Sequence, residues 1–245
     1  MIRMRITTSI LINLYIIAIV HEGYAMDAEL KSAVVFGATG LIGGFVVEQL
    51  LKDKRYGKVR LLSRRLLELE HEKLEQHVVD FDNLLSFRSL VEANHVYCCF
   101  GTTIKKAGSQ QEFIKIDHDI PLRISKFANE NGAEYFALVS SLGANTGSSN
   151  FYCNIKGLLE DNVREQFKQK IGIFRPALLL GEREEVRRAE RIGQRLFPLL
   201  NPLLRGGFKR YKAIKAETVA RAMITIAFRD TELTVFESEE IALIG

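Results

Sequence analysis

The chain has 245 residues, which is long enough for one large α/β domain or for a domain with a small additional lobe. Its composition, with 47% hydrophobic and 26% charged residues, is ordinary for a globular protein, and the net charge of +4 is too small to indicate a nucleic-acid-binding protein. The three cysteines and five histidines have no spacing typical of a metal site or a disulfide framework. We therefore expect no metal, and reduced thiols in a cytoplasmic protein.

The first 25 residues differ from the rest of the chain. Two arginines precede Ile6–Val20, a stretch of fifteen residues without a charge, and small residues stand at positions 23 and 25. This is the outline of a signal peptide, and the apolar stretch is short for a membrane span of about 20 residues. We favour a translation start at Met26, with a membrane anchor or targeting segment as the alternative. Membrane contact is expected only if residues 6–20 are retained, and residues 26–245 are taken as one domain.

From Met26 onward, short apolar runs alternate with helical periodicity, which predicts a Rossmann-like, doubly wound α/β fold with a mostly parallel sheet. Strands are expected at Ala33–Phe36, Val59–Leu62, His77–Val79, Val96–Phe100, Tyr135–Val139 and Ile171–Phe174, with weak strands at Val235–Phe236 and Ile241–Leu243. Helices are expected at Leu41–Leu51, Leu84–Glu92, Gln110–Asn131, Phe151–Phe167 and Ala216–Phe228. Residues 64–75 are expected to form a loop or a weak helix, and Pro121 to start or kink the main part of its helix.

The pattern changes in the C-terminal third. Residues 183–212 hold nine Lys or Arg against three Glu, and Leu196–Leu204 is an apolar stretch broken by two prolines. We interpret the basic residues as an ordinary charged helix face, and the apolar stretch as a pocket wall or a contact between subunits. Residues 182–212 and the C-terminus are expected to form a small cap over the carboxyl edge of the sheet, where ligands bind in such folds. A homodimer or a protein partner is left open, and no nucleic-acid partner is expected.

The first predicted strand runs into a glycine-rich turn, Gly37-Ala38-Thr39-Gly40-Leu41-Ile42-Gly43, and then into a helix. In a dinucleotide-binding turn, Gly37 permits the tight turn, Gly40 the close approach of a pyrophosphate, and Gly43 the contact between helix and strand. The free N–H groups and the positive end of the helix dipole then face the phosphates. The strand before the turn and the helix after it favour nucleotide binding over a glycine turn that binds nothing.

The end of the second predicted strand bears on which dinucleotide binds. An acidic residue there would bind the ribose 2′-hydroxyl of NAD, whereas an arginine accommodates the 2′-phosphate of NADP. The chain has Ser63-Arg64-Arg65 and no carboxylate before Glu68. We therefore expect NADP(H), with the Arg64 guanidinium and the Ser63 hydroxyl on the phosphate. Asp80 follows the third strand and is expected either to accept a hydrogen bond from the adenine amino group or to cap its own loop.

A second group of polar residues combines Ser140-Ser141, at the end of the fifth strand, with Tyr152 and Lys156 on the next helix. Tyr152 and Lys156 stand at i and i+4 and so share one helix face. A tyrosine with a pKa of about 10 is a poor acid–base at neutral pH, and a nearby ammonium lowers that pKa. The lysine can also bind the nicotinamide ribose while a serine hydroxyl polarises a substrate carbonyl. This set predicts proton delivery to oxygen as NADPH delivers hydride to carbon.

With these motifs the chain resembles the short-chain dehydrogenase/reductase superfamily, in its atypical branch related to the Tat-interacting protein. The matching segments, in family order over residues 32–180, are the glycine turn, Ser63-Arg64-Arg65, Cys99-Phe100-Gly101-Thr102-Thr103, Ser140-Ser141-Leu142-Gly143-Ala144, Phe151-Tyr152-Cys153-Asn154-Ile155-Lys156-Gly157 and Phe174-Arg175-Pro176. The resemblance implies an NADP(H)-binding Rossmann fold. The cofactor contacts that it implies are the pyrophosphate over Thr39–Ile42, the 2′-phosphate near Arg64, the adenosine near Asp80, Gly101 and Thr102 along the cofactor, and Pro176–Leu178 on the nicotinamide side.

The resemblance also implies catalytic roles. Tyr152 and Lys156 fall on the catalytic pair of the family, and the matching serine is Ser141 or Ser140, of which we prefer Ser141 because it precedes the loop. The usual Asn-Asn-Ala-Gly after the fourth strand is replaced by residues 100–103, Phe-Gly-Thr-Thr. This departure removes the asparagine framework that supports the proton relay in conventional members, and the atypical branch includes regulators.

Two functions of different classes follow from these residues. The first is an NADP-dependent reductase of a small carbonyl substrate, in which Tyr152 gives the proton, Lys156 lowers the pKa of that tyrosine and Ser141 holds the carbonyl oxygen. The second is a non-catalytic NADPH-binding protein that senses redox state or stabilises a partner. A sugar-nucleotide epimerase or dehydratase is less favoured, because the chain is short for the larger substrate domain of such enzymes.

Overall fold

The computed structural model describes residues 29–180 and 213–245, and Lys31–Gly245 form one compact unit. The expected N-terminal segment at residues 1–25 and the 182–212 part of the expected cap lie outside the described residues. Within the described ranges, no helix is long and apolar enough to cross a membrane.

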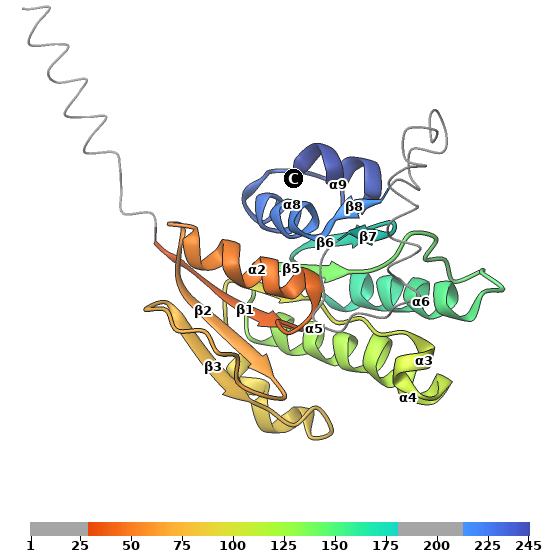
Figure 1. Cartoon of the computed structure of the whole chain (residues 1–245), viewed down its shortest axis with the longest axis horizontal. Coiled ribbons are helices and arrows are strands. Elements are labelled where there is room, and N and C mark those ends of the chain that lie inside the picture. Colours follow the sequence, from red (N-terminus) through yellow and green to blue (C-terminus); the bar gives the residue numbers. More distant parts are fainter. Residues whose placement is uncertain (1–28, 181–212) are drawn as a thin grey trace, which may run out of the picture. The chain divides into compact units, whose positions relative to one another are not determined.

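A seven-stranded sheet forms the centre of this unit (Figure 1). Its strands, in spatial order, are β3 (Leu74–Val78), β2 (Tyr56–Ser63), β1 (Lys31–Phe36), β4 (His95–Cys98), β5 (Tyr135–Val139), β6 (Lys170–Arg175) and β9 (Val235–Glu237). Every neighbouring pair is parallel. The chain adds strands first on one side of β1 and then, from β4 onward, on the other. The strand order therefore reverses between β1 and β4, and ligands of such sheets bind outside the carboxyl ends of the strands at this point.

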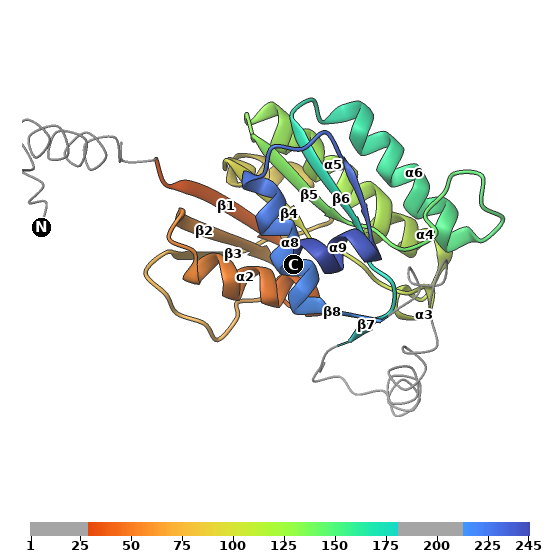
Figure 2. The same cartoon turned by 90° about the horizontal axis from the view of Figure 1, so that it is seen from above.

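Helices cover both faces of the sheet, as Figure 1 and Figure 2 show. One face carries α2 (Leu41–Lys52), α8 (Ala216–Phe228) and α9 (Ser238–Ile244), and the other carries the 3-10 helix η1 (Leu84–Val91), α5 (Ile120–Glu130) and α6 (Phe151–Gln166). Successive side chains of a strand point to opposite faces. In β1, Ala33 and Val35 accordingly join the core on the α2 and α8 face, whereas Val34 and Phe36 join the core on the α5 and α6 face. Because both faces are buried from Ala33 onward, the segment Ala33–Phe36 is apolar throughout, which made it recognisable in the sequence.

The helical region before β5 contains a break that matters for the site. It consists of α3 (Ile104–Ala107), α4 (Gln110–Ile114), a π-helical turn η2 (Lys115–Asp119) and α5. Pro121 stands in the first turn of α5, as expected. A proline lacks the N–H that would bond to residue 117, and its ring crowds that carbonyl. The helix widens there, so that the Ile120 amide donates to the Lys115 carbonyl, five residues earlier.

The structure corrects several predicted elements. The strand expected at Ile241–Leu243 is wrong: these residues belong to α9, whose start is fixed by a capping box between Glu237 and Glu240. Three apolar residues are too few to distinguish a strand from one buried turn of helix. Residues 64–73 form a loop, and β3 begins at Leu74, earlier than expected. The sequence also did not predict β7 (Leu179–Leu180) and β8 (Ile214–Lys215), which pair in a separate parallel sheet.

The C-terminus, expected to be part of a cap, has its own place in the fold. It adds β9 to the edge of the sheet beside β6, and α9 packs against α8. It also reaches the carboxyl edge, where the Ala177 amide donates to Ser238 Oγ at 3.2 Å. The other part of the expected cap lies outside the described residues, so the cap as a whole stays a prediction.

Candidate nucleotide-binding and catalytic site

The turn from β1 into α2 has the close packing that its glycines predict. Gly37 adopts a φ of +77°, and a Cβ there would lie 2.6 Å from the Cys99 carbonyl oxygen. A Cβ on Gly43 would lie 2.2 Å from the Gly37 carbonyl oxygen, because the first turn of α2 rests directly on the strand end. Neither position accepts a side chain without movement of the backbone, since real Cβ atoms do not approach so closely. The turn therefore requires glycine at both positions.

The N-terminus of α2 has the features of an anion site. Its N-cap is Gly40, so no side chain caps the helix, and its first turn has no acidic residue. Among residues 29–180 and 213–245, a Cβ on Gly40 would meet only the Gly37 carbonyl oxygen within 4 Å, and Thr39 beside it is exposed. The uncapped N–H groups of Leu41 and Ile42 and the helix dipole favour negative charge here. The turn therefore fits a dinucleotide pyrophosphate.

The turn after β2 holds two exposed arginines, Arg64 and Arg65, and neither guanidinium has an ion-pair or hydrogen-bond partner among residues 29–180 and 213–245. The Ser63 hydroxyl, by contrast, donates to the Arg65 carbonyl at 2.5 Å, and its residue is buried. In this conformation the Ser63 hydroxyl donates within its own turn, and its expected contact with a phosphate stays a prediction. The Arg64 and Arg65 guanidinium groups are left as the side-chain donors at this turn.

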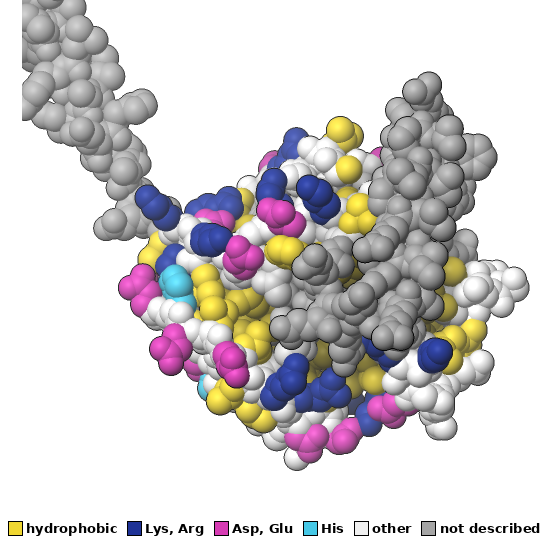
Figure 3. All heavy atoms as spheres, viewed as in Figure 1, with side chains coloured by type: hydrophobic (Ala, Val, Ile, Leu, Met, Phe, Trp, Pro, Cys, Tyr) yellow, Lys and Arg dark blue, Asp and Glu magenta, His cyan; other side chains and the backbone are white. Residues whose placement is uncertain are grey.

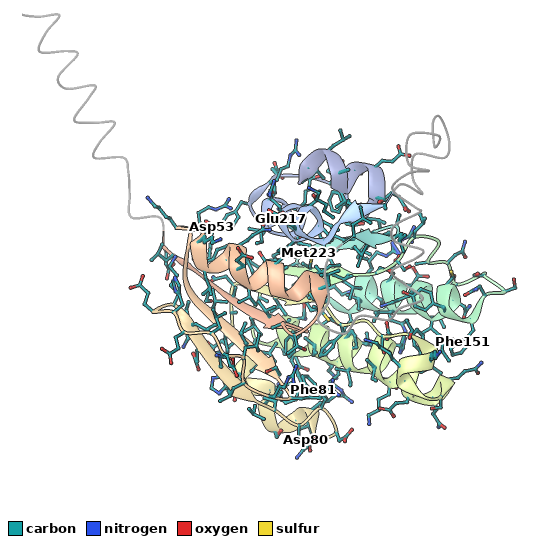
Figure 4. The ribbon with its side chains drawn as sticks, in the orientation of Figure 1. Asp53, Asp80, Phe81, Phe151, Glu217 and Met223 are labelled. Atoms are coloured by element: carbon teal, nitrogen blue, oxygen red, sulfur yellow. The ribbon has the colours of Figure 1, made fainter. Side chains whose placement is uncertain are left out.

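The loop after β3 is on the same edge of the sheet. Asp80 is exposed, and its Oδ1 accepts from the Asp82 amide at 2.9 Å, which is the loop-capping role considered for it. The next residue, Phe81, packs against Phe100 with the ring centroids 5.2 Å apart. Figure 4 labels both Asp80 and Phe81. In the part of the chain that the structure describes, the second Asp80 oxygen has no hydrogen-bond partner, and its expected contact with an adenine amino group stays a prediction.

The loop after β4 is held in place by Asp117, which is not among the predicted site residues. Gly101 is exposed, and the Thr102 amide donates to Asp117 Oδ2 at 2.9 Å. Asp117 lies in the π-helical turn η2 and is 0% exposed. The two residues expected to line the cofactor thus belong to a loop anchored on a buried carboxylate.

The structure separates the two adjacent serines. Ser140 is buried, and its hydroxyl donates to the carboxylate of Glu160 on α6. Glu160 is 0% exposed and forms an ion pair with Arg175 at 2.5 Å. Ser141 is half-buried, and its hydroxyl lies 3.4 Å from the Leu142 carbonyl oxygen, too far for a strong hydrogen bond. Within residues 29–180 and 213–245 the Ser141 hydroxyl thus has only this weak contact, and its role in binding a ligand stays a prediction.

The first turns of α6 carry Tyr152 and Lys156. The helix begins after Asn150, whose side chain accepts from the Cys153 amide at 3.1 Å. Tyr152 is half-buried, and its ring packs on Phe113 with the centroids 5.5 Å apart. Figure 4 shows the neighbouring Phe151 at the start of this helix. Lys156 stands one turn further on.

Lys156 is only 2% exposed, and its Nζ forms an ion pair with Asp117 Oδ1 at 2.8 Å. Burial alone would lower the pKa of Lys156, but the Asp117 carboxylate and Tyr152 outweigh it, and the pKa lies above its usual value. The lysine is therefore charged at neutral pH. Asp117 could have been found in the sequence, because it lies at i+4 from Phe113 and three residues before Ile120, on the apolar stripe of its helix.

The loop after β6 completes the site. Pro176 is buried, and its carbonyl accepts from the Leu142 amide at 3.2 Å, so this loop lies beside the turn that holds Ser141. The Ser140 amide donates to the Phe174 carbonyl at 2.7 Å. The expected nicotinamide-side residues, Pro176–Leu178, therefore adjoin the serine turn at the carboxyl edge of the sheet.

This chain is similar to one known protein family and to several known proteins. A profile of the NAD dependent epimerase/dehydratase family matches residues 33–153. Protein HTATIP2 of Rattus norvegicus is 32% identical over 221 residues, which cover 88% of this chain and 89% of the relative. The mitochondrial protein FMP52 of Debaryomyces hansenii is 33% identical over 204 residues, or 80% of this chain and 87% of the relative.

Solved structures of the same fold include a UDP-glucose 4-epimerase of Thermotoga maritima, with a TM-score of 0.62 and 18% identity over 84% of this chain and 74% of that one. At this identity the likeness shows the fold alone. The family match and the relatives support a protein of the oxidoreductase type that binds a nicotinamide dinucleotide. The chain belongs to the short-chain dehydrogenase/reductase superfamily, in its atypical branch with the HTATIP2-like proteins.

Proposed function

We propose that this protein is an NADP(H)-dependent reductase of small carbonyl compounds. The proposal rests on the first two turns of α6, where half-buried Tyr152 stands one helical turn before a buried and charged Lys156. These residues follow the serine turn on the carboxyl side of a sheet whose glycine turn fits a dinucleotide.

The cofactor would be held by groups that the described structure leaves available. The N–H groups of Leu41 and Ile42 would bind the pyrophosphate, and the Arg64 guanidinium would form a charge-assisted, bidentate contact with the 2′-phosphate. Asp80 would accept from the adenine amino group. Lys156 has further N–H donors besides the one directed at Asp117, and one of these would bind the nicotinamide ribose.

In the proposed reaction a carbonyl compound becomes an alcohol. NADPH, when bound, would supply the hydride for the carbonyl carbon and be oxidised to NADP+. The Ser141 hydroxyl donates a hydrogen bond to the carbonyl oxygen, and the Tyr152 phenol gives that oxygen its proton. The Lys156 ammonium stabilises the phenolate that results, and solvent returns the proton to Tyr152 before the next turnover.

The cofactor part of the proposal is tested by fluorescence titration of the full chain with NADPH and NADH. We expect a preference for NADPH that falls by about 10- to 100-fold in Arg64→Ala, which corresponds to the loss of a charged hydrogen bond of about 1.5–3 kcal/mol. Arg65→Ala is the matched control, because Arg65 is also exposed but is not assigned to the phosphate. Failure of the chain to bind either nucleotide would refute the proposal.

The catalytic part is tested with a panel of aldehydes and ketones and Tyr152→Phe. Turnover of any of them should fall by at least about 100-fold in the variant while NADPH affinity is retained, because only the phenolic hydroxyl that supplies the proton is removed. Equal turnover by the variant would exclude Tyr152 as the proton donor.

A second candidate is a non-catalytic NADPH-binding redox sensor or assembly protein, and the Asp117–Lys156 ion pair favours it. A carboxylate 2.8 Å from the lysine offsets part of the positive charge that would make Tyr152 more acidic. NADPH binding without turnover of any carbonyl compound, and with Tyr152→Phe indistinguishable from the wild type, would support this candidate instead.

Partners and location belong to the proposal as well. On the face in Figure 3, Lys and Arg side chains lie intermixed with Asp and Glu, which supports a small-molecule substrate rather than a nucleic acid. A homodimer or protein partner is tested by the mass of the protein in solution. We propose a cytoplasmic location, and the mitochondrial names of the fungal relatives provide the alternative that cell fractionation would reveal.

A further inference from the structure

Asp117 joins two parts of the proposed site that come from different elements. Its Oδ2 accepts from the Thr102 amide at 2.9 Å, in the loop after β4, and its Oδ1 lies 2.8 Å from Lys156 Nζ, on α6. The residue itself belongs to the π-helical turn η2. π-Helical turns are rare, and often occur at functional sites. One carboxylate thus fixes the distance between the cofactor loop and the lysine.

The charges around Lys156 show what this contact does. The groups that act on its ammonium are Asp117 from η2, Tyr152 on its own helix and Cys98 from β4. Burial raises the pKa of Cys98 to about 12, so its thiol is neutral. Glu160, one turn further along α6, has its carboxylate paired with Arg175. Asp117 is therefore the anion that compensates for the burial of Lys156.

We propose that Asp117 is a positioning residue that keeps Lys156 protonated and aimed at the cofactor ribose while it fixes the Thr102 loop beneath the same ribose. The inference rests on the proposed function. It makes Lys156 a donor whose charge is independent of pH over the neutral and moderately alkaline range. Without the Asp117 charge, burial would make the buried ammonium release its proton more easily.

The test is the pH dependence of NADPH affinity in the full chain between pH 7.5 and 9.5. Asp117→Asn preserves the shape of the side chain and an oxygen that accepts from Thr102, but removes the charge. Wild-type affinity should stay constant over this range, because Lys156 stays charged. Lys156→Met should bind NADPH about 10-fold or more weakly at every pH, through loss of a charged hydrogen bond.

Asp117→Asn should bind almost as well as wild type at pH 7.5 and lose affinity progressively towards the Lys156→Met value at pH 9.5. In the double variant Asp117→Asn/Lys156→Met this pH dependence should disappear. Glu160→Gln is the matched control, since it also removes a buried carboxylate of α6 but one that pairs with Arg175. Its affinity should be independent of pH.

The outcomes separate this inference from the proposed function. No NADPH binding by the wild type, or full affinity in Lys156→Met, would refute the proposed cofactor site. Constant affinity of Asp117→Asn over the pH range, with weak binding by Lys156→Met, would overturn only the role of Asp117. If Asp117→Asn does not fold, the wild-type titration still decides, because a loss of affinity towards pH 9.5 down to the Lys156→Met value would overturn the inference.

Discussion

The stability of this protein should depend on pH through one buried histidine. His95, at the start of β4, is 2% exposed, and its Nδ1 lies 2.6 Å from the Tyr56 hydroxyl. The same hydroxyl lies 2.6 Å from that of Tyr97. Burial disfavours the charged imidazolium and lowers the pKa of His95 to about 4. The folded protein therefore keeps His95 neutral, whereas the unfolded chain protonates it as the pH falls below about 6.5.

The sign and size of the effect follow from linkage. The unfolded state binds the proton first, so the contribution to stability is complete above pH 6.5 and is lost as the pH falls towards 4. The pKa of His95 is about 6.5 in the unfolded chain and about 4 in the folded protein, so the free energy of unfolding falls by about 2 kcal/mol between pH 7.5 and 5.0. The carboxylates with lowered pKa values, such as Glu75 with a pKa of about 2, titrate mainly below this window.

The assay is urea unfolding at pH 7.5 and 5.0, with His95→Asn, which removes the titrating group, and His71→Asn, which alters an exposed histidine, as the control. Between pH 7.5 and 5.0, the free energy of unfolding of the wild type and of His71→Asn should each fall by about 2 kcal/mol more than that of His95→Asn. The other histidines contribute equally to all three proteins and cancel in the difference. An equal loss in the wild type and His95→Asn would refute the argument that His95 is buried in its neutral form.

Two further predictions compare neighbouring residues. Gly43→Ala should weaken both folding and nucleotide binding, because its Cβ would lie 2.2 Å from a backbone oxygen. In Gly44→Ala the atom nearest to the new Cβ lies at 3.6 Å, so this variant should keep its NADPH affinity. In thermal unfolding it should be neutral or more stable by up to about 1 kcal/mol. Ser140→Ala should cost about 1–3 kcal/mol of stability by removing the hydrogen bond to Glu160. Ser141→Ala should instead lower reductase turnover with little change in stability. Reversed effects of the two serine variants would contradict the assignment of Ser141.

The layered fold was predictable because its central strands, such as β4 and β5, are buried on both faces. A strand such as β5, Tyr135–Val139, is apolar at every position, and its predicted bounds are confirmed. The α8 bounds are confirmed as well, because its apolar spacing persists over three turns. Short elements lack such repetition. The two-residue strands β7 and β8 are defined only by pairing with each other across more than 30 residues, and no local pattern indicates that pairing.

The glycine turn was predictable for a different reason. Gly37 and Gly43 are required by contacts within one strand–turn–helix unit, so their spacing shows in the sequence. The division between Ser140 and Ser141 depends instead on Glu160, twenty positions after Ser140, and on Arg175 in β6. Two adjacent serines look alike until the partner of each is known. The sequence could therefore name the pair but could not derive which member is free.

Buried charges on helices are a signal that the sequence does contain. Lys156 and Glu160 both stand on the buried side of α6, and Asp117 stands on the buried side of its own helix. A charge in such a place is retained only if a partner offsets the cost of its burial. Three charges on two apolar stripes therefore predict partners across the helix interface, and the pairing of Asp117 with Lys156 and of Glu160 with Arg175 is the arrangement that leaves none of them alone. Because one of these charges is the proposed catalytic lysine, the same constraint that stabilises the core also sets the charge state of the site.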